Sequence, residues 1–426
     1  MTKEVLNEDI HSQRFTVTSE NLIILAVSLS LFGGRWISYI GFPNYNLFLV
    51  DLFYFFGLLG IVIFQKKSFN SKNTILITFI LTLFISFQIF RNLNLPLITR
   101  LRDLVPFLYL IATPVIIRKF PETAWIRTIK VARYATLFGA IWTDLVLLGI
   151  LKEFSALQQF SGVPIFSARW DHSGISLCIG LLLWGSFPRA KLRDNTLVRL
   201  FLLSSILLQY SRASYVGLFF VLLSIYFVAK SRKKIDPFQK TSFLNACLAL
   251  SIVAIPILTL VAPMLPQKSA LSRIGIENLF SPGKLIQDTR NSGTANARIE
   301  SQKLLTGWIY QNQLEFLGAG PGREMVLESK AYVFLSGARD VRSPHSWFYG
   351  NFGRFGYLGL IMWHLICFSY IRAQRARLQV FDFPANILIV IYIIALFGVV
   401  MESPFGILPF SFFLGGGKLL DLSKDD

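Results

Sequence analysis

Long apolar runs separated by short polar segments dominate this chain. A helix that crosses a bilayer needs about 20 predominantly apolar residues, and runs near this length recur along the sequence. They lie at residues 21–41, 46–64, 74–90, 103–117, 132–151, 171–187, 197–210, 213–229, 243–264, 345–370, 383–400 and 403–417. The pattern predicts an all-α polytopic membrane protein with about twelve transmembrane helices.

One long polar segment, residues 265–342, interrupts these runs. The sequence therefore divides into an N-terminal transmembrane bundle of about nine helices at 1–264, a large outer loop at 265–342, and C-terminal transmembrane helices at 343–426. Within the outer loop, a helical pattern is expected over residues 295–313.

Composition and charge agree with this organisation. Hydrophobic residues make up 53% of the chain and charged residues 15%. Basic side chains gather in alternate connecting segments, at 65–73, 118–131, 188–196, 230–240 and 371–382. By the positive-inside rule, these segments and both termini are cytoplasmic, and residues 265–342 lie outside. The formal net charge of +18 is divided among loops on both faces, so we expect membrane lipids as partners and no nucleic acid.

The outer side has its own basic residues, and arginine predominates over lysine there. The arginines are Arg35, Arg91, Arg100, Arg102, Arg169, Arg212, Arg273, Arg290, Arg298, Arg323, Arg339, Arg342 and Arg354. A guanidinium binds phosphate oxygens in a bidentate manner and stays protonated. The arginine excess favours a phosphorylated or pyrophosphorylated lipid headgroup as ligand. The alternative is that these arginines bind anionic lipids or pair with local acids.

His345 is the candidate catalytic residue. Ser343 and Pro344 have the character of an N-cap and a first helical residue, which would place His345 in the first turn of a helix. The positive end of the helix dipole disfavours the imidazolium, and a neutral imidazole is a competent general base. His172 is the rival, although its neighbour Asp171 favours the imidazolium. The alternative for either histidine is a simple interfacial residue.

Two glycine-containing segments flank this region. Residues 317–324 read LGAGPGRE and either end a helix as a turn or bind phosphate through backbone N–H groups. Glycines recur every three residues from 350 to 359, which is typical of close helix packing. Arg354, on the same predicted helix, is expected to pair with a buried acid, and the candidates are Asp51, Asp144 and Glu402.

Four segments, taken in order, resemble the O-antigen ligase and polymerase superfamily of bacterial membrane glycosyltransferases. These segments are SARWDHSGISLCIGLLL (167–183), SRASYVGLFF (211–220), ARIESQKLLTGWIYQNQLEFLGAGPG (297–322) and PHSWFYGNFGRFGYLGL (344–360). His172 departs from the family pattern, which often has a small or amide residue at that position.

The resemblance implies an inverting, metal-independent enzyme of the bacterial inner membrane, with no cofactor and with its active site on the periplasmic side. The donor would be a glycan on undecaprenyl pyrophosphate, and the acceptor a glycan or lipid-linked hydroxyl. His345 would be the catalytic base. Arg212 and Arg298 would hold the pyrophosphate, and Arg102 and Arg169 are further candidates for this substrate-binding role.

Three functions remain open at this point. The first is an O-antigen ligase that moves a glycan to lipid A-core or a similar acceptor. The second is an O-antigen or exopolysaccharide polymerase that joins repeat units on the same lipid carrier. The third is a polysaccharide or lipid transporter. Two features argue against a transporter: no internal repeat is visible in the sequence, and the charges of interest cluster at one face.

Overall fold

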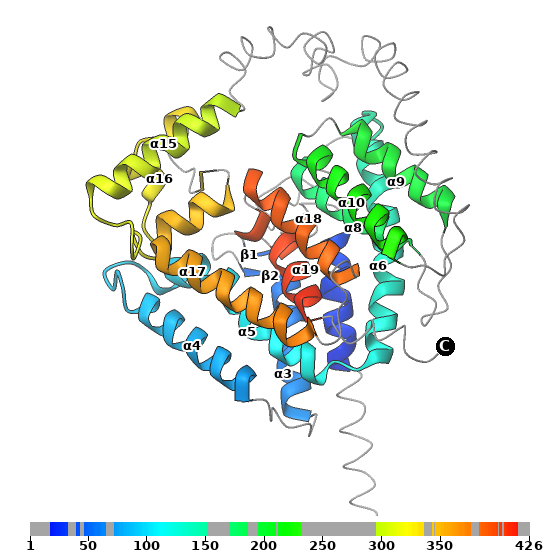
Figure 1. The fold of residues 1–426 in the computed structure, drawn as a ribbon, viewed down its shortest axis with the longest axis horizontal. Helices are drawn as coiled ribbons and strands as arrows, with labels where there is room; N and C mark the ends of the chain where they lie inside the picture. The colour runs from blue at the N-terminus through cyan, green and yellow to red at the C-terminus, as the bar shows by residue number, and fades with distance from the viewer. Residues whose placement is uncertain are drawn as a thin grey trace, which may run out of the picture.

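The computed structural model describes residues 18–32, 40–42, 47–64, 72–151, 170–185, 195–209, 212–231, 295–335, 343–344, 346–375, 383–398, 400–402 and 404–415. Residues 18–31 are helical. The named helices are α3 (Leu49–Phe64), α4 (Lys72–Ile89), α5 (Leu97–Lys119), α6 (Glu122–Leu147), α8 (Trp170–Leu183), α9 (Thr196–Leu208), α10 (Arg212–Ser231), α15 (Ala295–Gln311), α16 (Met325–Glu328), α17 (Trp347–Arg375), α18 (Phe383–Phe397) and α19 (Pro404–Leu414), with the 3₁₀ turns η3 (Ala331–Phe334) and η4 (Val400–Glu402). Figure 1 shows their arrangement.

The described part of the chain is all-helical apart from one minimal strand pair. β1 (Gly41–Phe42) pairs antiparallel with β2 (Leu47–Phe48). Most predicted apolar runs coincide with a helix, although the basic segment 118–131 is not a loop, because α5 ends at Lys119 and α6 begins at Glu122. The run at 243–264 lies outside the described residues. Within the described ranges, no helix combines the length and the apolar character needed to cross a membrane.

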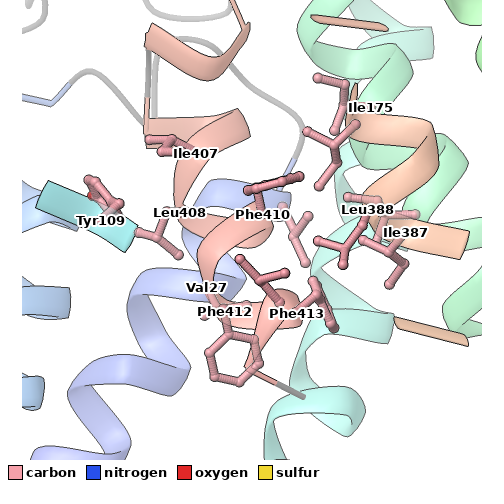
Figure 2. Packing of buried hydrophobic residues seen from close by; sticks show 14 of the residues in the cluster. Val27, Tyr109, Ile175, Ile387, Leu388, Ile407, Leu408, Phe410, Phe412 and Phe413 are labelled. Carbon is pink, nitrogen blue, oxygen red and sulfur yellow. The ribbon is translucent and has the colours of Figure 1, made fainter. Parts of the chain in front are cut away.

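The short helix α19 occupies the centre of the bundle. Every one of its side chains is buried, as expected for a helix that is apolar on all sides. Figure 2 shows Leu408, Phe410, Phe412 and Phe413 of this helix among buried side chains of neighbouring helices. Because η4 directly precedes α19, this packed core fixes the position of Glu402, the last residue of η4.

Helices α8 and α10 run in the same direction with their starts side by side. A side chain at Gly174 would collide with Ser214 Oγ, and one at Gly217 would contact Cys178 Sγ at 3.4 Å. Gly217, about one and a half turns from the start of α10, also packs against Ile394 near the end of α18. The start of α10 therefore lies close to the end of α18.

Helix α17 is sharply bent at Gly356, so that it forms two arms (Figure 1). Gly356 has φ 62° and ψ −160°, a conformation essentially restricted to glycine. The bend brings the rings of Trp347 and Trp363 to a centroid distance of 4.8 Å, although 16 residues of straight helix would separate them by about 24 Å. The apolar run predicted at 345–370 therefore does not form one straight helix.

The bend opens two backbone hydrogen bonds of α17, and residues 315–320 replace both. The N–H groups of Tyr357 and Leu358 donate to the carbonyls of Glu315 and Phe316 at 2.8 and 3.0 Å. The carbonyls of Gly353 and Arg354 accept from the N–H groups of Ala319 and Gly320, each at 2.8 Å. All four backbone groups freed by the bend are thus satisfied, as buried backbone requires. We call residues 315–322 the glycine loop.

We predict that Gly356→Ala destabilises the protein by at least about 1–3 kcal/mol, because alanine is strained in this backbone conformation and its Cβ would lie 2.4 Å from the Phe316 carbonyl oxygen. Gly307→Ala is the matched control. It lies in the middle of α15, nothing surrounds its Cβ position within 4 Å, and alanine there should stabilise by about 0.5–1 kcal/mol. Thermal unfolding of the purified protein measures both, and equal effects would contradict this description of the bend.

Candidate functional site

A cluster of buried charges lies between the first arm of α17, helix α5 and turn η4. Arg354 is 5% exposed. Its Nε lies 3.4 Å from Asp103 Oδ2, and its Nη1 lies 3.0 Å from Glu402 Oε1. The expectation that Arg354 pairs with a buried acid is confirmed for Glu402, and the pairing with Asp51 or Asp144 is wrong. Asp51 instead accepts a hydrogen bond from Tyr109, and Asp144 accepts one from Ser205.

Hydrogen bonds from other elements complete the environment of both acids. The Gly322 N–H donates to Asp103 Oδ2 at 2.7 Å, and the Ser343 hydroxyl donates to Glu402 Oε1 at 3.1 Å. Gly350 allows the close approach of η4, since a Cβ there would lie 2.5 Å from Glu402 Oε1. Charges this well paired and hydrogen-bonded can be buried without a prohibitive desolvation cost.

Arg102 is the more exposed cation of the cluster. Its Nε lies 3.7 Å from Asp103 Oδ1, and its side chain is 22% exposed, against 6% for Arg354. Burial lowers the pKa of Arg102, while the charge of Asp103 acts in the opposite direction, and Arg354 and Glu402 are near enough to contribute. Arg102 stays protonated in any case. It is thus a cation with one weak ion pair and a partly open side chain.

The described residues on both sides of His345 are fixed by this cluster and by α18. Ser343 binds Glu402, and the Trp347 N–H donates to the Gly398 carbonyl at 3.0 Å. Helix α17 begins at Trp347, so the expected N-cap at Ser343 is wrong, and the expected place of His345 in the first helical turn lies outside the described residues. The hydroxyl of Ser343 is engaged by Glu402 and caps no helix. His345 itself lies outside the described residues.

The glycine loop does not have the geometry of a phosphate cradle. Its N–H groups at Gly318, Ala319, Gly320 and Gly322 donate to Leu314 O, Gly353 O, Arg354 O and Asp103 Oδ2. The phosphate-binding alternative for residues 317–324 is therefore wrong, because protein acceptors already occupy these donors. The other alternative, a turn that ends a helix, is not confirmed for these residues, since α15 already ends at Gln311 and residues 312–314 make the turn that follows it.

The spaced glycines of α17 serve packing, as their spacing predicted. Gly350 faces Glu402, and Gly356 forms the bend. Gly353 faces Met325, whose sulfur would lie 2.4 Å from a Cβ at position 353.

Arg91 and Arg100, two of the outer arginines, donate to backbone carbonyls. Arg91 donates to Leu317 and Gly318, and Arg100 donates to Ile89.

The structure places three of the predicted substrate-binding residues on different elements: Arg102 on α5, Arg212 at the start of α10 and Arg298 on α15. Arg102 belongs to the buried cluster. Arg212 is the first residue of α10, which places its backbone near the end of α18 that binds Trp347. Arg298 is half-buried on α15, about two turns before Leu305, and α15 joins the cluster through the glycine loop. Arg169 and the side chains of Arg212 and His172 lie outside the described residues.

Sequence reasoning missed Asp103, which links Arg102, Arg354 and the glycine loop. One feature of the sequence could have pointed to Asp103: it follows Arg102 directly and stands at the start of an apolar run. An acid at such a boundary is costly to bury without a partner, and the partner lies more than two hundred residues further along the chain.

Comparison with known proteins gives one family. Residues 197–364 match the family model described as O-antigen ligase, which confirms the resemblance to the O-antigen ligase and polymerase superfamily. The matched region runs from α9 into the second arm of α17 and contains Arg212, Arg298, the glycine loop and His345. No curated protein matches the chain.

Removal of Arg354 should be far more damaging to stability than removal of Arg102. Arg354→Leu leaves Asp103 and Glu402 without their buried counterion, which costs about 3–5 kcal/mol. Arg102→Leu loses a long, partly exposed ion pair worth under about 1 kcal/mol. Thermal unfolding of the two purified variants provides the comparison. A fully stable Arg354→Leu protein would contradict the assignment of Arg354 as the central charge of the cluster.

Proposed function

We propose that this chain, whose residues 197–364 belong to the O-antigen ligase family, transfers a glycan from undecaprenyl pyrophosphate to an acceptor hydroxyl of lipid A-core or a similar molecule. The observation that carries this proposal is the cluster of two arginines and two acids, in which Glu402 accepts a hydrogen bond from Ser343, two residues before His345 in the sequence. Such a framework holds a short segment rigidly enough for acid–base chemistry.

In the proposed reaction, His345 removes the proton from the acceptor hydroxyl as the oxygen attacks the anomeric carbon of the donor. The bond from that carbon to the pyrophosphate oxygen breaks, and undecaprenyl pyrophosphate leaves with the electron pair. One displacement from the opposite face inverts the anomeric configuration. The proton remains on His345 until it is released to solvent. A positioned base of this kind contributes about 10²–10⁴-fold in rate.

The leaving group requires cations, because negative charge develops on its bridging oxygen. We assign this role to Arg212, Arg298 and Arg102, with Arg169 as a further ligand. Arg102 is suited to the role because Arg354 already forms the closer contacts with both acids of the cluster. Preorganised cations in a partly desolvated site stabilise such charge strongly.

We place the enzyme in the bacterial inner membrane, with both termini cytoplasmic and the site on the periplasmic side. Apolar faces exposed on the helices support this location. Phe79, Leu83 and Phe87 of α4, with Phe90 just after its end, form one stripe and are 47–70% exposed. The second arm of α17 exposes a similar stripe at Tyr357, Ile361, Leu365 and Phe368. Stripes of this kind are a liability in water and are stable against lipid.

The first test is complementation of a strain that lacks the gene, with expression checked for each variant. We expect His345→Ala and Arg212→Ala to abolish attached surface polysaccharide on a gel while the loaded lipid carrier accumulates. His364→Ala is the matched control and should retain product. It is a histidine on the second arm of α17 whose ring contacts Leu360 O and Tyr392. Full product from both His345→Ala and Arg212→Ala would overturn the catalytic assignment and favour the transporter.

The same strain separates ligase from polymerase. The single long outer segment before His345 favours the ligase on resemblance. A ligase null should keep long glycan chains on the carrier and lose only their attachment to lipid A-core. If the null instead yields attached single repeat units, the enzyme is a polymerase that extends the glycan on the same carrier. The two patterns differ on one gel of surface polysaccharide.

A further inference from the structure

The turn between α4 and α5 holds the glycine loop on the side that faces away from α17. Arg91 donates to the carbonyls of Leu317 and Gly318. Asn92 Nδ2 donates to the carbonyls of Ala319 and Pro321 at 3.1 and 3.2 Å. Burial lowers the pKa of Arg91, and nearby Arg323 lowers it further, yet the guanidinium stays charged. Charged donors to carbonyls form strong hydrogen bonds, so we call Arg91 and Asn92 the clamp.

The clamp and α17 bind the two sides of one short loop. Carbonyls of the loop point to the clamp, while the N–H groups of Ala319 and Gly320 point to the bend of α17. The fit is tight, since a Cβ at Gly318 would lie 2.3 Å from the Arg354 carbonyl carbon and one at Gly320 would lie 2.5 Å from Asn92 Nδ2. A shift of the α4–α5 turn is therefore passed to the bend.

The first arm of α17 amplifies any such shift. From Gly356 back to Trp347 the arm is about 14 Å long, and Trp347 follows residue 345 by two positions in the sequence. A tilt of about 5° at the bend therefore moves that end by about 1 Å, a misplacement that can cost about 100-fold in rate. The geometry of the bend thus controls where the segment with His345 is presented.

We propose that Arg91 and Asn92 are positioning residues for the glycan transfer, acting through the glycine loop and the bend of α17 on the segment that contains His345. The inference rests on the proposed function, because it assigns these two residues a role in that reaction. Neither is assigned to substrate contact, since their donor groups bind the loop carbonyls.

Asn92 allows a conservative test. Its φ is 54°, a left-handed conformation that asparagine, aspartate and glycine tolerate. Asn92→Asp replaces the donor by a negatively charged acceptor that faces the two loop carbonyls, and Asn92→Gly removes the whole side chain without adding charge. Asn312→Asp is the matched control, because Asn312, just after the end of α15, donates through Nδ2 at 2.7 Å to Trp308 O in the last turns of that helix and contacts no loop carbonyl in the described contacts.

The experiment measures transfer by the purified full-length protein from a lipid-linked glycan to its acceptor, together with hydrogen–deuterium exchange. For Asn92→Asp we expect kcat to fall about tenfold or more while KM for the donor changes less than about twofold. Exchange should accelerate at residues 318–320 and 357–358 and not elsewhere. Asn312→Asp should match the wild type in both measurements.

Two outcomes would overturn the positioning role. One is a kcat within about twofold of wild type despite faster exchange at the loop, which would make the clamp purely structural. The other is an equal loss of kcat in Asn312→Asp. If Asn92→Asp exchanges faster throughout the chain, Asn92→Gly is judged by the same criteria. If the wild-type protein transfers no glycan, the proposed function itself is refuted. Failure of the proposed function is thus distinguishable from failure of the positioning role, which is judged only by comparing variants with an active wild type.

Discussion

The exchange of four hydrogen bonds between the glycine loop and the bend of α17 is the constraint on which the rest of the site depends. Without it, the amides of Tyr357 and Leu358 and the carbonyls of Gly353 and Arg354 would be unpaired. An unpaired backbone group costs about 1–3 kcal/mol where it is buried, as it is at Gly353 and Arg354. The bend is therefore stable only with the loop in place, and the loop in turn ties α15 and the α4–α5 turn to α17.

The charge cluster follows from this bend. Arg354 lies two residues before Gly356 on the first arm, and the bend directs that arm across the start of α5 and against η4. Asp103 connects the two features, since it accepts from Gly322 of the loop and pairs with Arg354. The buried core around α19 fixes Glu402 from the other side. Backbone and charge thus hold the segment around His345 together.

Much of this fold was predictable from the sequence, because apolar runs of helical length locate helices reliably. The helix over residues 295–313 and the packing role of the glycines at 350 and 353 followed from local pattern alone. The bend did not, because a glycine at position 356 fits a straight helix as well as a bent one. Its cause lies in a loop some forty residues away. Asp103 was missed for the same reason, since local pattern carries no information about a distant partner.

The revised site changes how the outer arginines divide their roles. Arg91 and Arg100 bind backbone carbonyls, and Arg354 neutralises acids. Arg102 keeps an open side chain in the same region. Part of the arginine excess predicted for the outer side is therefore structural, because Arg91, Arg100 and Arg354 bind protein groups, and we propose the ligand-binding role only for others such as Arg102.

The central claim is a single displacement at the anomeric carbon. The most direct measurement is reconstitution of the purified protein with a lipid-linked glycan of known anomeric configuration and its acceptor. Nuclear magnetic resonance would then define the new glycosidic bond, and the released lipid would be counted. The account predicts inverted configuration and one undecaprenyl pyrophosphate released for each bond formed. Retained configuration, or bond formation without that release, would contradict it.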